Sequence, residues 1–279
     1  MAITNFIPTI WSENLVRALD QEYVGVAHCN RDYEGEIKNC GSVVKICGVG
    51  AVDIQDYTKN SDMSEPQSLS DTVSSLTINQ AKYFNFQIDD VDRAQSLPKL
   101  MDAAMSVAAA GLAKTADEHV FKLCSQTENI VYKSTINDKE ILLSVFEARE
   151  RLFSAGVTDS SQIVLEVNPV VASMILKARL NTYPEISHDL FENGCLGTIA
   201  DCRIYVSNNI PMAYNDNEGV NCNIGIMRTR RAVAFAEQLS EIEAYRPEKR
   251  FADAVKGLHL YGAAMVYPKE CIRLDFSAL

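Results

Sequence analysis

Acidic residues gather at one place in the chain. Asp89, Asp90 and Asp92 all lie within the stretch DDVDR. Three carboxylates so close in sequence could bind a divalent cation, because Mg²⁺ and Ca²⁺ prefer oxygen ligands. The stretch also directly precedes a long predicted helix, and negative charges there stabilise the helix dipole. We favour this second interpretation and keep a cytoplasmic metal-dependent enzyme centred on these residues as an alternative.

The histidines and cysteines form no recognisable catalytic or metal-binding motif. His119 lies near the apolar side of the long predicted helix, which favours a packed side chain over a general base. Cys195 and Cys202 would need distant partners to complete a tetrahedral metal site. We expect reduced, buried thiols from synthesis in a cytoplasm. The histidines are His28, His119, His188 and His259, and the cysteines are Cys29, Cys40, Cys47, Cys124, Cys195, Cys202, Cys222 and Cys271.

Two further segments could meet phosphate. The GVG sequence at residues 48–50 lacks the third glycine of a dinucleotide fingerprint and precedes a predicted strand rather than a helix. Arg228, Arg230 and Arg231 lie in the run RTRR, for which we prefer an intersubunit or surface role. The sequence also lacks the G-x-S-x-G, Walker and H-E-x-x-H motifs. We therefore expect no catalytic, cofactor-binding or metal site, and no enzyme.

The composition is that of a folded, acidic protein. The chain has 279 residues, of which 47% are hydrophobic and 23% are charged. No apolar run approaches the roughly 20 residues that span a bilayer, and the first residues do not resemble a signal peptide. The net charge of −11 argues against a DNA-reading role, because proteins that grip nucleic acid present a basic face. It is compatible with enclosing DNA without holding it.

One stretch organises the rest of the chain. Residues from Ser96 to Cys124 predict a single helix of about 40 Å, with Ser96 as N-cap and Pro98 in the first turn. Its many alanines predict a thin surface against which other elements can lie closely. Apolar residues at helical spacing form one stripe, namely Leu97, Leu100, Met101, Ala104, Met105, Ala108, Leu112, Ala116, Val120 and Leu123.

The residues before this helix predict an arm and a hairpin. Residues 1–41 contain a short amphipathic helix that includes Leu15 and Leu19, and they hold too few apolar residues to fold alone. Residues 42–88 predict a long two-arm β-hairpin with a polar tip at 58–71, in which AKYFNFQID belongs to the returning arm. Because an isolated hairpin is only marginally stable in water, we expect it to pack on a partner surface.

After the long helix, strands alternate with helices. NIVYKS predicts a short strand, residues 139–156 predict a helix ending at Gly156, and SQIVLEVNP predicts a buried strand leading into a helix opened by Pro169. The strands IADCRIYVSNNIP and NCNIGIMR flank a turn-rich loop at residues 212–221. This alternation predicts an α/β layer. The remaining tail has β character, and we expect it to return to the long helix.

This order of elements resembles the major capsid proteins of tailed bacteriophages, the Hong Kong 97-type fold. The resemblance covers essentially the whole chain and rests on that order together with FIPTIWSENL, QAKYFNFQIDDVDRAQ and KGLHLYGAAMVYPKECIRL. It implies an α+β subunit with an N-arm, an extended E-loop hairpin, a P-domain built on a spine helix, and an α/β A-domain. The implied ranges are 1–41 for the N-arm, 42–88 for the E-loop, 89–132 for the P-domain with its spine helix, 133–235 for the A-domain and 236–279 for the closing P-domain strands.

The resemblance implies a shell protein. Copies of the chain would assemble through hexamers and pentamers into an icosahedral capsid that encloses double-stranded DNA without reading its sequence, with no membrane partner. Its location would be the virion, after synthesis in the bacterial host cytoplasm. Portal and decoration proteins are further implied partners. In some family members a scaffolding region precedes the arm, whereas Met1 leads almost directly into it here. We therefore expect a separate scaffolding protein or a processed chain.

Two questions stay open at this point. An encapsulin-like compartment shares the implied fold but encloses cargo enzymes, and it typically opens with a short helix inside the shell. Residues 1–41 favour the phage version, with its crossing arm. Some relatives also form covalent Lys–Asn crosslinks between subunits. Lys59 lies in the implied hairpin tip, where we favour an ordinary solvated lysine.

Overall fold

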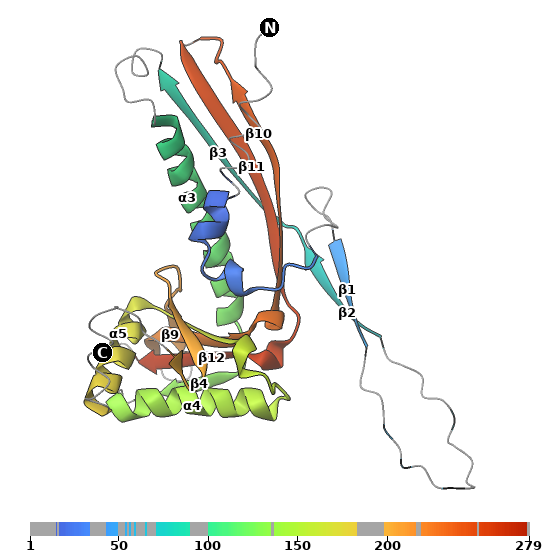
Figure 1. Ribbon diagram of the computed structural model, residues 1–279, viewed down its shortest axis with the longest axis vertical. Helices are drawn as coiled ribbons and strands as arrows, with labels where there is room; N and C mark the ends of the chain where they lie inside the picture. The colour runs from blue at the N-terminus through green and yellow to red at the C-terminus, as the bar shows by residue number, and fades with distance from the viewer. Residues whose placement is uncertain are drawn as a thin grey trace.

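The subunit has an upright part, a lower part and a hairpin that extends to one side (Figure 1). Helix α3 (Leu100–Ser125) and a three-stranded sheet form the upright part, and a larger sheet with two helices forms the lower part. The computed structural model describes residues 15, 17–33, 43–49, 54, 56, 59, 65, 71–89, 100–134, 137–182, 198–215, 219–249 and 251–277.

Helix α3 confirms the long predicted helix over the described residues. It spans 26 residues and ends at Ser125, one residue beyond the predicted end. Four members of the predicted apolar stripe are buried, namely Met105, Leu112, Ala116 and Val120. The buried face is wider than predicted, because it also contains Ala109, Ala113, Asp117, Phe121 and Cys124. Residues 96–99 lie outside the described residues.

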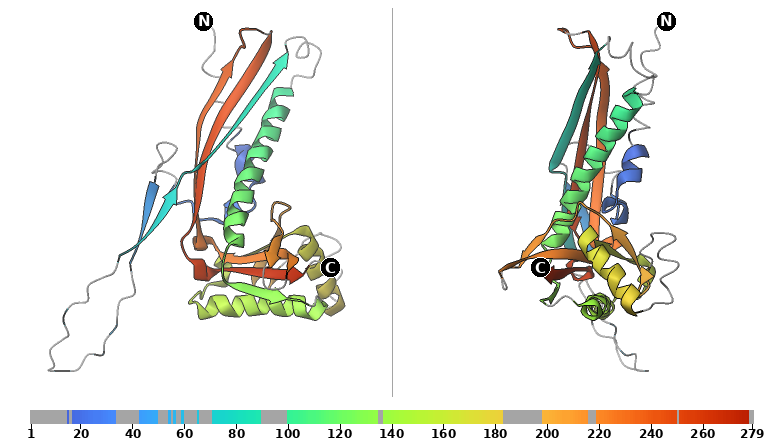
Figure 2. Two further views of the ribbon diagram at one scale, coloured as in Figure 1. Left: turned by 180° about the vertical axis from the view of Figure 1, so that it is seen from behind. Right: turned by 90° about the vertical axis from the view of Figure 1, so that its left-hand side faces the viewer.

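The upright sheet has the order β10-β11-β3 and is antiparallel throughout. Its strands are β3 (Gln80–Asp89), β10 (Val233–Tyr245) and β11 (Ala252–Met265). Strand β11 packs on α3, and the views in Figure 2 show the helix lying along the length of this sheet. The expected return of the tail to the long helix is therefore confirmed for β10 and β11.

The predicted hairpin splits into two differently paired segments. Strand β1 (Val43–Val49) pairs with β2 (Asp71–Thr77), as expected for two arms. The AKYFNFQID segment, in contrast, forms β3 and pairs with β11 instead of with the outgoing arm. Burial explains the difference, because Phe84 and Phe86 alternate along β3 and pack against the core beneath α3.

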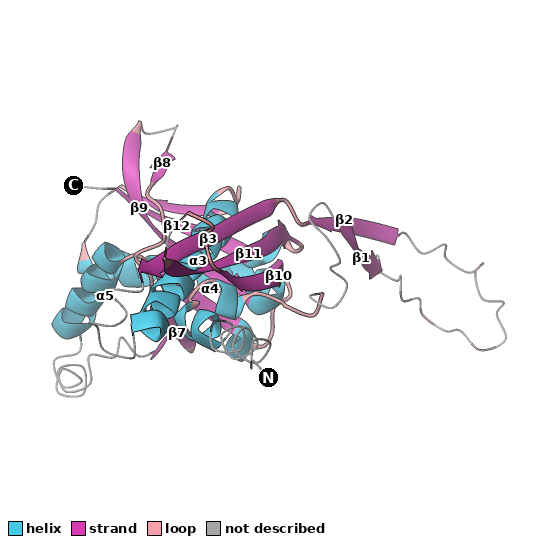
Figure 3. Ribbon diagram, turned by 90° about the horizontal axis from the view of Figure 1, so that it is seen from above, coloured by secondary structure: helices cyan, strands magenta, loops and turns pink. Residues whose placement is uncertain are grey.

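The base of the β1–β2 hairpin packs on the subunit's own sheet. Four buried hairpin residues meet Ala234, Ala236 and Leu260 of the upright sheet, and these four are Val44, Ile46, Leu76 and Ile78. The expected partner surface of the hairpin is therefore intramolecular at its base. The strands then lead away from the body of the subunit (Figures 1 and 3).

The lower part is the predicted α/β layer. Its seven-stranded sheet has the order β4-β12-β9-β5-β7-β6, and β8 pairs with β9. Helices α4 (Asp138–Ser154) and α5 (Pro169–Thr182) pack on each other and on this sheet, around a second buried core. The strands are β4 (Ile130–Lys133), β5 (Ile163–Val167), β6 (Thr198–Ile199), β7 (Cys202–Val206), β8 (Ala213–Asn215), β9 (Val220–Thr229) and β12 (Cys271–Ser277).

The predicted stop of α4 at Gly156 and the predicted start of α5 at Pro169 are confirmed, and α4 begins at Asp138, one residue before the predicted start. The Asn137 side chain accepts a hydrogen bond from the Glu140 N–H at 2.9 Å and so caps α4. At the other end, Gly156 has φ +96°, and its N–H bonds to the Phe153 carbonyl while the Val157 N–H bonds to the Leu152 carbonyl. These two bonds are the Schellman arrangement.

Two sequence-based expectations are wrong in detail. The last strand, β12, does not return to the upright sheet but inserts between β4 and β9 in the lower one. Its burial is complete from Cys271 to Phe276, and a strand buried on both faces belongs in the centre of a covered sheet. The expected loop at 212–221 contains β8 and the start of β9, which pair with each other.

Two glycines give opposite predictions for the same substitution. Gly156→Ala should destabilise the subunit by about 1 kcal/mol, because a Cβ disfavours positive φ. Gly111→Ala, on the exposed side of α3 with open space around it, should stabilise the subunit by about 0.5–1 kcal/mol. Urea unfolding of the unassembled subunit measures both. Equal effects of the two substitutions would contradict the assignment of Gly156 as the helix stop.

Candidate assembly surfaces and the ionic centres beneath them

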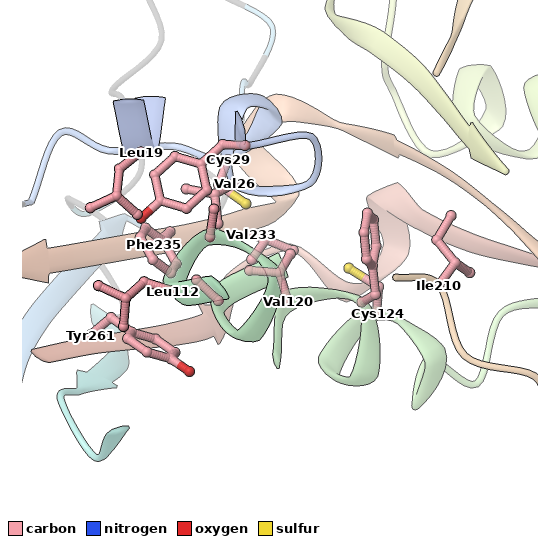
Figure 4. Close-up of a cluster of buried hydrophobic side chains, with 14 of the residues drawn as sticks. Leu19, Val26, Cys29, Leu112, Val120, Cys124, Ile210, Val233, Phe235 and Tyr261 are labelled. Atoms are coloured by element: carbon pink, nitrogen blue, oxygen red, sulfur yellow. The ribbon is translucent and has the colours of Figure 1, made fainter. Parts of the chain in front are cut away.

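The N-terminal segment, residues 17–33, joins the two parts of the subunit. It lies beside α3 (Figure 1), and its apolar side chains enter the core between that helix and the upright sheet. Figure 4 shows Leu19, Val26 and Cys29 from this segment with Leu112 and Val120 of α3 and Val233 and Phe235 of β10. The segment is also held by three ionic centres, each built around an acidic side chain on a different element.

Arg228 and Glu166 form the first of these ionic centres. Both side chains are completely buried, and two hydrogen bonds of 2.8 and 2.9 Å join them as a bidentate pair. Arg228 also donates to the backbone carbonyls of His28 and Gly25, at 2.9 and 2.7 Å, and contacts Cys29 Sγ at 3.5 Å. Every one of the five guanidinium N–H groups thus has an acceptor.

The charges of this centre stabilise each other. Burial opposes ionisation of Glu166, but the Arg228 charge and the hydrogen bonds from His28 and Arg228 outweigh it and lower the carboxyl pKa. Burial likewise opposes the Arg228 charge, and Glu166 more than compensates, so the pKa of Arg228 rises. Burial raises the pKa of the neighbouring Cys29 thiol to about 12, which keeps it neutral. The centre is a saturated structural pair without a reactive group.

Asp117 forms the second centre from within α3. Its carboxylate accepts hydrogen bonds from the backbone N–H groups of Val24, Gly25 and Val26, at 3.0, 3.0 and 2.9 Å. Burial raises its pKa, while these three N–H groups act in the opposite direction. A Cβ at Gly25 would lie 2.8 Å from the Phe121 ring, so only glycine lets the segment approach the helix this closely.

Glu237 of β10 forms the third centre. It accepts a hydrogen bond from the Tyr23 hydroxyl and another from Arg31 at 2.6 Å, and His259 Nε2 lies 2.8 Å from it. Burial opposes its ionisation, but the hydrogen bonds from His259 and Tyr23 and the nearby positive charges lower the pKa of its carboxyl. Tyr23 and Arg31 belong to the N-terminal segment, so this centre ties the segment to the upright sheet.

The structure revises the interpretation of the basic run. Arg228 is not at a surface, as we expected, but lies at the centre of the buried pair with Glu166. Arg231 pairs with Glu270 at 2.6 Å within the same chain. Only Arg230 of the three arginines is left exposed without a described ion pair. The surface role was wrong for Arg228 because the run straddles the end of β9, a strand whose residues are all buried from Cys222 to Thr229.

The other candidate residues give no catalytic constellation in the part of the chain that is described. His119 packs edge-on against Tyr261 at 5.7 Å, as predicted, and His28 and His259 face Glu166 and Glu237. Among the described residues, no three histidine, cysteine or acidic side chains are arranged to hold a metal, and no helix is long and apolar enough to cross a membrane. Outside the described residues lie Asp90, Asp92, Cys40, His188 and Cys195.

Sequence reasoning missed Glu166, Asp117 and Glu237. A signal existed for the first two, since each is an acidic residue within an apolar pattern. Glu166 interrupts the buried strand IVLEV, and Asp117 follows Ala113 and Ala116 on the buried side of the long helix. Acidic residues are almost never fully buried without partners, so such an interruption indicates a buried pair or cap.

Several large apolar side chains are exposed on the described surface. Tyr83 is 78% exposed and pairs across the sheet with Leu258, and Phe251 is 84% exposed near the start of β11. On α4, Leu143 and Phe146 are each about half exposed, and Phe153 lies two turns further on. Exposed apolar groups that recur along one element are typical of protein–protein contact surfaces.

Similar solved structures extend over nearly the whole chain. A structure from Mycobacterium phage Che8 is 24% identical with a TM-score of 0.71, and the match covers 90% of both chains. The capsid of cyanophage P-SCSP1u is 15% identical with a TM-score of 0.70, covering 90% of this chain and 87% of that one. The chain has the phage capsid fold. This confirms the fold family that the sequence resembled.

The capsid fold extends beyond phages. A virus-like particle from Pyrococcus furiosus is 13% identical with a TM-score of 0.56, and the match covers 96% of this chain and 99% of that one. No protein-family model matches the sequence, and no curated protein matches it. The three structures described here are 13–24% identical to this chain, so the likeness is one of fold.

The buried pair predicts a non-additive mutational cycle. Glu166→Leu or Arg228→Met alone leaves a buried unpaired charge and should cost about 3–5 kcal/mol of unfolding free energy. The double variant should lose less than the sum of the two, because both charges are gone. Urea denaturation of the unassembled subunit measures the cycle. Additive losses would show that the two side chains do not stabilise each other.

The Glu237 centre predicts acid sensitivity. Its folded pKa lies below the ordinary value of 4.5, so its stabilisation is present above that value and is lost as the pH falls through the folded pKa. Asp117, with its raised pKa, acts in the opposite sense. Glu237→Gln should therefore lower stability at pH 7 and flatten the fall in stability as the pH drops below the ordinary carboxyl value of 4.5. Unfolding midpoints measured across that range test this, and an unchanged slope would contradict it.

Proposed function

We propose that this chain is a major capsid protein that assembles with itself, through hexamers and pentamers, into an icosahedral shell enclosing phage double-stranded DNA. The observation that carries the proposal is the agreement in fold with phage capsid structures, over 90% of this chain in the two matches described. The proposed role is structural, with no enzymatic activity. In this proposal the protein is made in the bacterial host cytoplasm and resides in the virion.

The described surface supports contacts between copies. The exposed apolar residues Tyr83 and Phe251 lie on the upright part, and Leu143 and Phe146 lie on the lower part. A subunit in a closed shell needs contact surfaces on several sides, since each copy meets several neighbours. Many modest contacts then add up to a durable particle without any single strong interface.

The parts of the subunit receive their family roles within this proposal. Helix α3 is the spine helix, the β1–β2 hairpin is the E-loop, and the α4–α5 layer is the A-domain. The ranges proposed from the sequence are 1–41, 42–88, 89–132, 133–235 and 236–279; within them, β3 lies in the upright sheet and β4 and β12 lie in the lower sheet. Because β12 and β4 lie in the lower sheet, the closing P-domain strands in this assignment are β10 and β11.

The N-terminal segment, as part of the proposed N-arm, is anchored on its own subunit. Residues 23–31 are held within their own subunit by Asp117, Arg228 and Glu237. A separate scaffolding protein, a portal and a decoration protein complete the proposed set of partners. The acidic net charge of −11 suits a container wall, because a wall that bound DNA tightly would hinder its entry and exit.

A second candidate is an encapsulin-like compartment that encloses cargo proteins. The likeness to a virus-like particle from Pyrococcus furiosus bears on it only as a second kind of shell with this fold, and that match covers 96% of this chain and 99% of that one. The higher TM-scores of the phage structures favour the capsid. The two functions differ in what the purified particle contains, nucleic acid or protein cargo.

Electron microscopy of the expressed chain, with and without a scaffolding partner, tests the proposal. Deleting residues 58–70 should abolish or strongly reduce particles and leave the urea unfolding midpoint of the subunit nearly unchanged. A variant that replaces the same residues with a Gly/Ser linker of equal length keeps the length of the segment and removes its side chains. It therefore shows whether assembly needs those side chains or only the length. Persistent monomers or dimers of the wild-type chain under every condition would refute the shell function.

A further inference from the structure

Two exposed arginines of the lower part have no acidic partner among the described residues, whereas five other arginines there form ion pairs. Arg149, Arg151, Arg228, Arg231 and Arg273 each pair with a carboxylate of the described chain. Arg203 of β7 and Arg230, which follows β9, have no such partner among the described residues, and both are exposed. In a chain with 37 acidic residues against 26 basic ones, two unpaired arginines close together require an explanation.

Sheet register brings these two arginines to one place. Arg203 lies opposite Val164 of β5, and Thr229, which precedes Arg230, lies opposite Ile163 of the same strand. Strands β7 and β9 flank β5, and Arg230 lies two residues beyond the position level with Arg203, so the two arginine backbones are separated by roughly 12 Å. Two guanidinium groups on such backbones can converge on one small anion placed between them.

Both arginines line one cavity. It has a volume of about 580 Å³ and is lined by both arginines and by Ser160, Ser161 and Thr198, whose hydroxyls can donate hydrogen bonds. Asp201 also lines the cavity, but its carboxylate is held by Arg149 at 3.0 Å. The lining therefore offers two positive charges and several donors to a ligand that accepts hydrogen bonds.

The cavity has a firm support on one side. Tyr205 also lines it and lies two residues from Arg203, on the same face of β7. Its ring packs on His28 with 4.0 Å between ring centroids, and His28 in turn faces Glu166 of the buried ionic centre. A site that rests on a buried pair is held in shape before its ligand arrives, which lowers the entropy lost on binding.

We propose that this cavity, with Arg203 and Arg230, binds a carboxylate side chain of a second copy of the chain. This inference rests on the proposed shell function. Planar guanidinium groups match carboxylates through paired hydrogen bonds, and the acidic composition ensures that a neighbouring copy presents many carboxylates. In a ring of copies, a cavity on one subunit meets a different surface of the next, so one such cavity per subunit serves every contact.

Nucleic-acid phosphate is the less favoured ligand. A DNA strand would bring many charges toward a chain of net charge −11, whereas a single carboxylate brings one. The phosphate alternative is a separate outcome of the experiment below.

Zero-length coupling identifies the ligand directly. Arg203→Lys and Arg230→Lys each keep the charge and supply an amine that a carbodiimide joins to a carboxylate in contact with it. Particles are assembled from mixed isotope-labelled and unlabelled chains, and coupled peptides are identified by mass spectrometry. We expect mixed-isotope pairs between position 203 or 230 and an acidic peptide, in particles and not in free subunits. Native Lys249, which is exposed, reports background coupling. Pairs within one chain only, or no pairs in particles, would overturn the proposal.

Arginine modification of the wild-type chain provides a second measurement that needs no variant. A dicarbonyl reagent should modify Arg203 and Arg230 about tenfold more slowly in particles than in free subunits, as for a contact of about 1.4 kcal/mol. Equal rates would contradict the contact. Protection only in DNA-filled particles, and not in empty ones, would assign the cavity to phosphate and reject the carboxylate. Failure to form particles at all would refute the shell function, whereas particles with unprotected arginines would refute only the cavity.

Discussion

The buried pair of Arg228 and Glu166 is the interaction on which the rest of the subunit depends. It joins β9 to β5 inside the lower sheet, and its remaining donors hold the backbone of Gly25 and His28. An unpaired charge buried here would carry a large unfavourable desolvation free energy. The pair therefore forms only when the N-terminal segment and both strands are in place together. The centre therefore makes the arrangement of three distant chain segments cooperative. Asp117 and Glu237 extend the same principle to the helix and to the upright sheet.

Much of the fold could be predicted because local patterns agree with the tertiary structure. The stop at Gly156, the start at Pro169 and the buried stripe through Leu112 and Val120 follow from local chemistry and periodicity. Strand pairing could not be predicted in the same way. Both β3 and β12 are recognisable as strands, yet their partners are distant in the sequence. The local sequence does not specify that β3 pairs with β11 or that β12 pairs with β9.

The candidate site was harder to predict than the fold. The residue type does not show whether a carboxylate is buried or solvated. Only the surrounding apolar pattern distinguishes Glu166 from an exposed glutamate. Arg228 and Arg230 are two residues apart but have opposite surroundings, because the first lies within a buried strand and the second lies beyond its end. Contact surfaces are harder still, since they depend on side chains such as Tyr83 and Phe251 that remain exposed in the single chain.

The continuity of β2 and β3 has a mechanical consequence. The hairpin strand ends at Thr77 and the sheet strand begins at Gln80, so a pull on the hairpin passes directly into β3. Strand β3 is paired with β11 along its full length, from Gln80 opposite Tyr261 to Asp89 opposite Ala252. A force along the strand loads all of these hydrogen bonds in shear at once, instead of opening them one after another. In a shell under internal pressure, a force on the hairpin would therefore be resisted by the hydrogen bonds between β3 and β11.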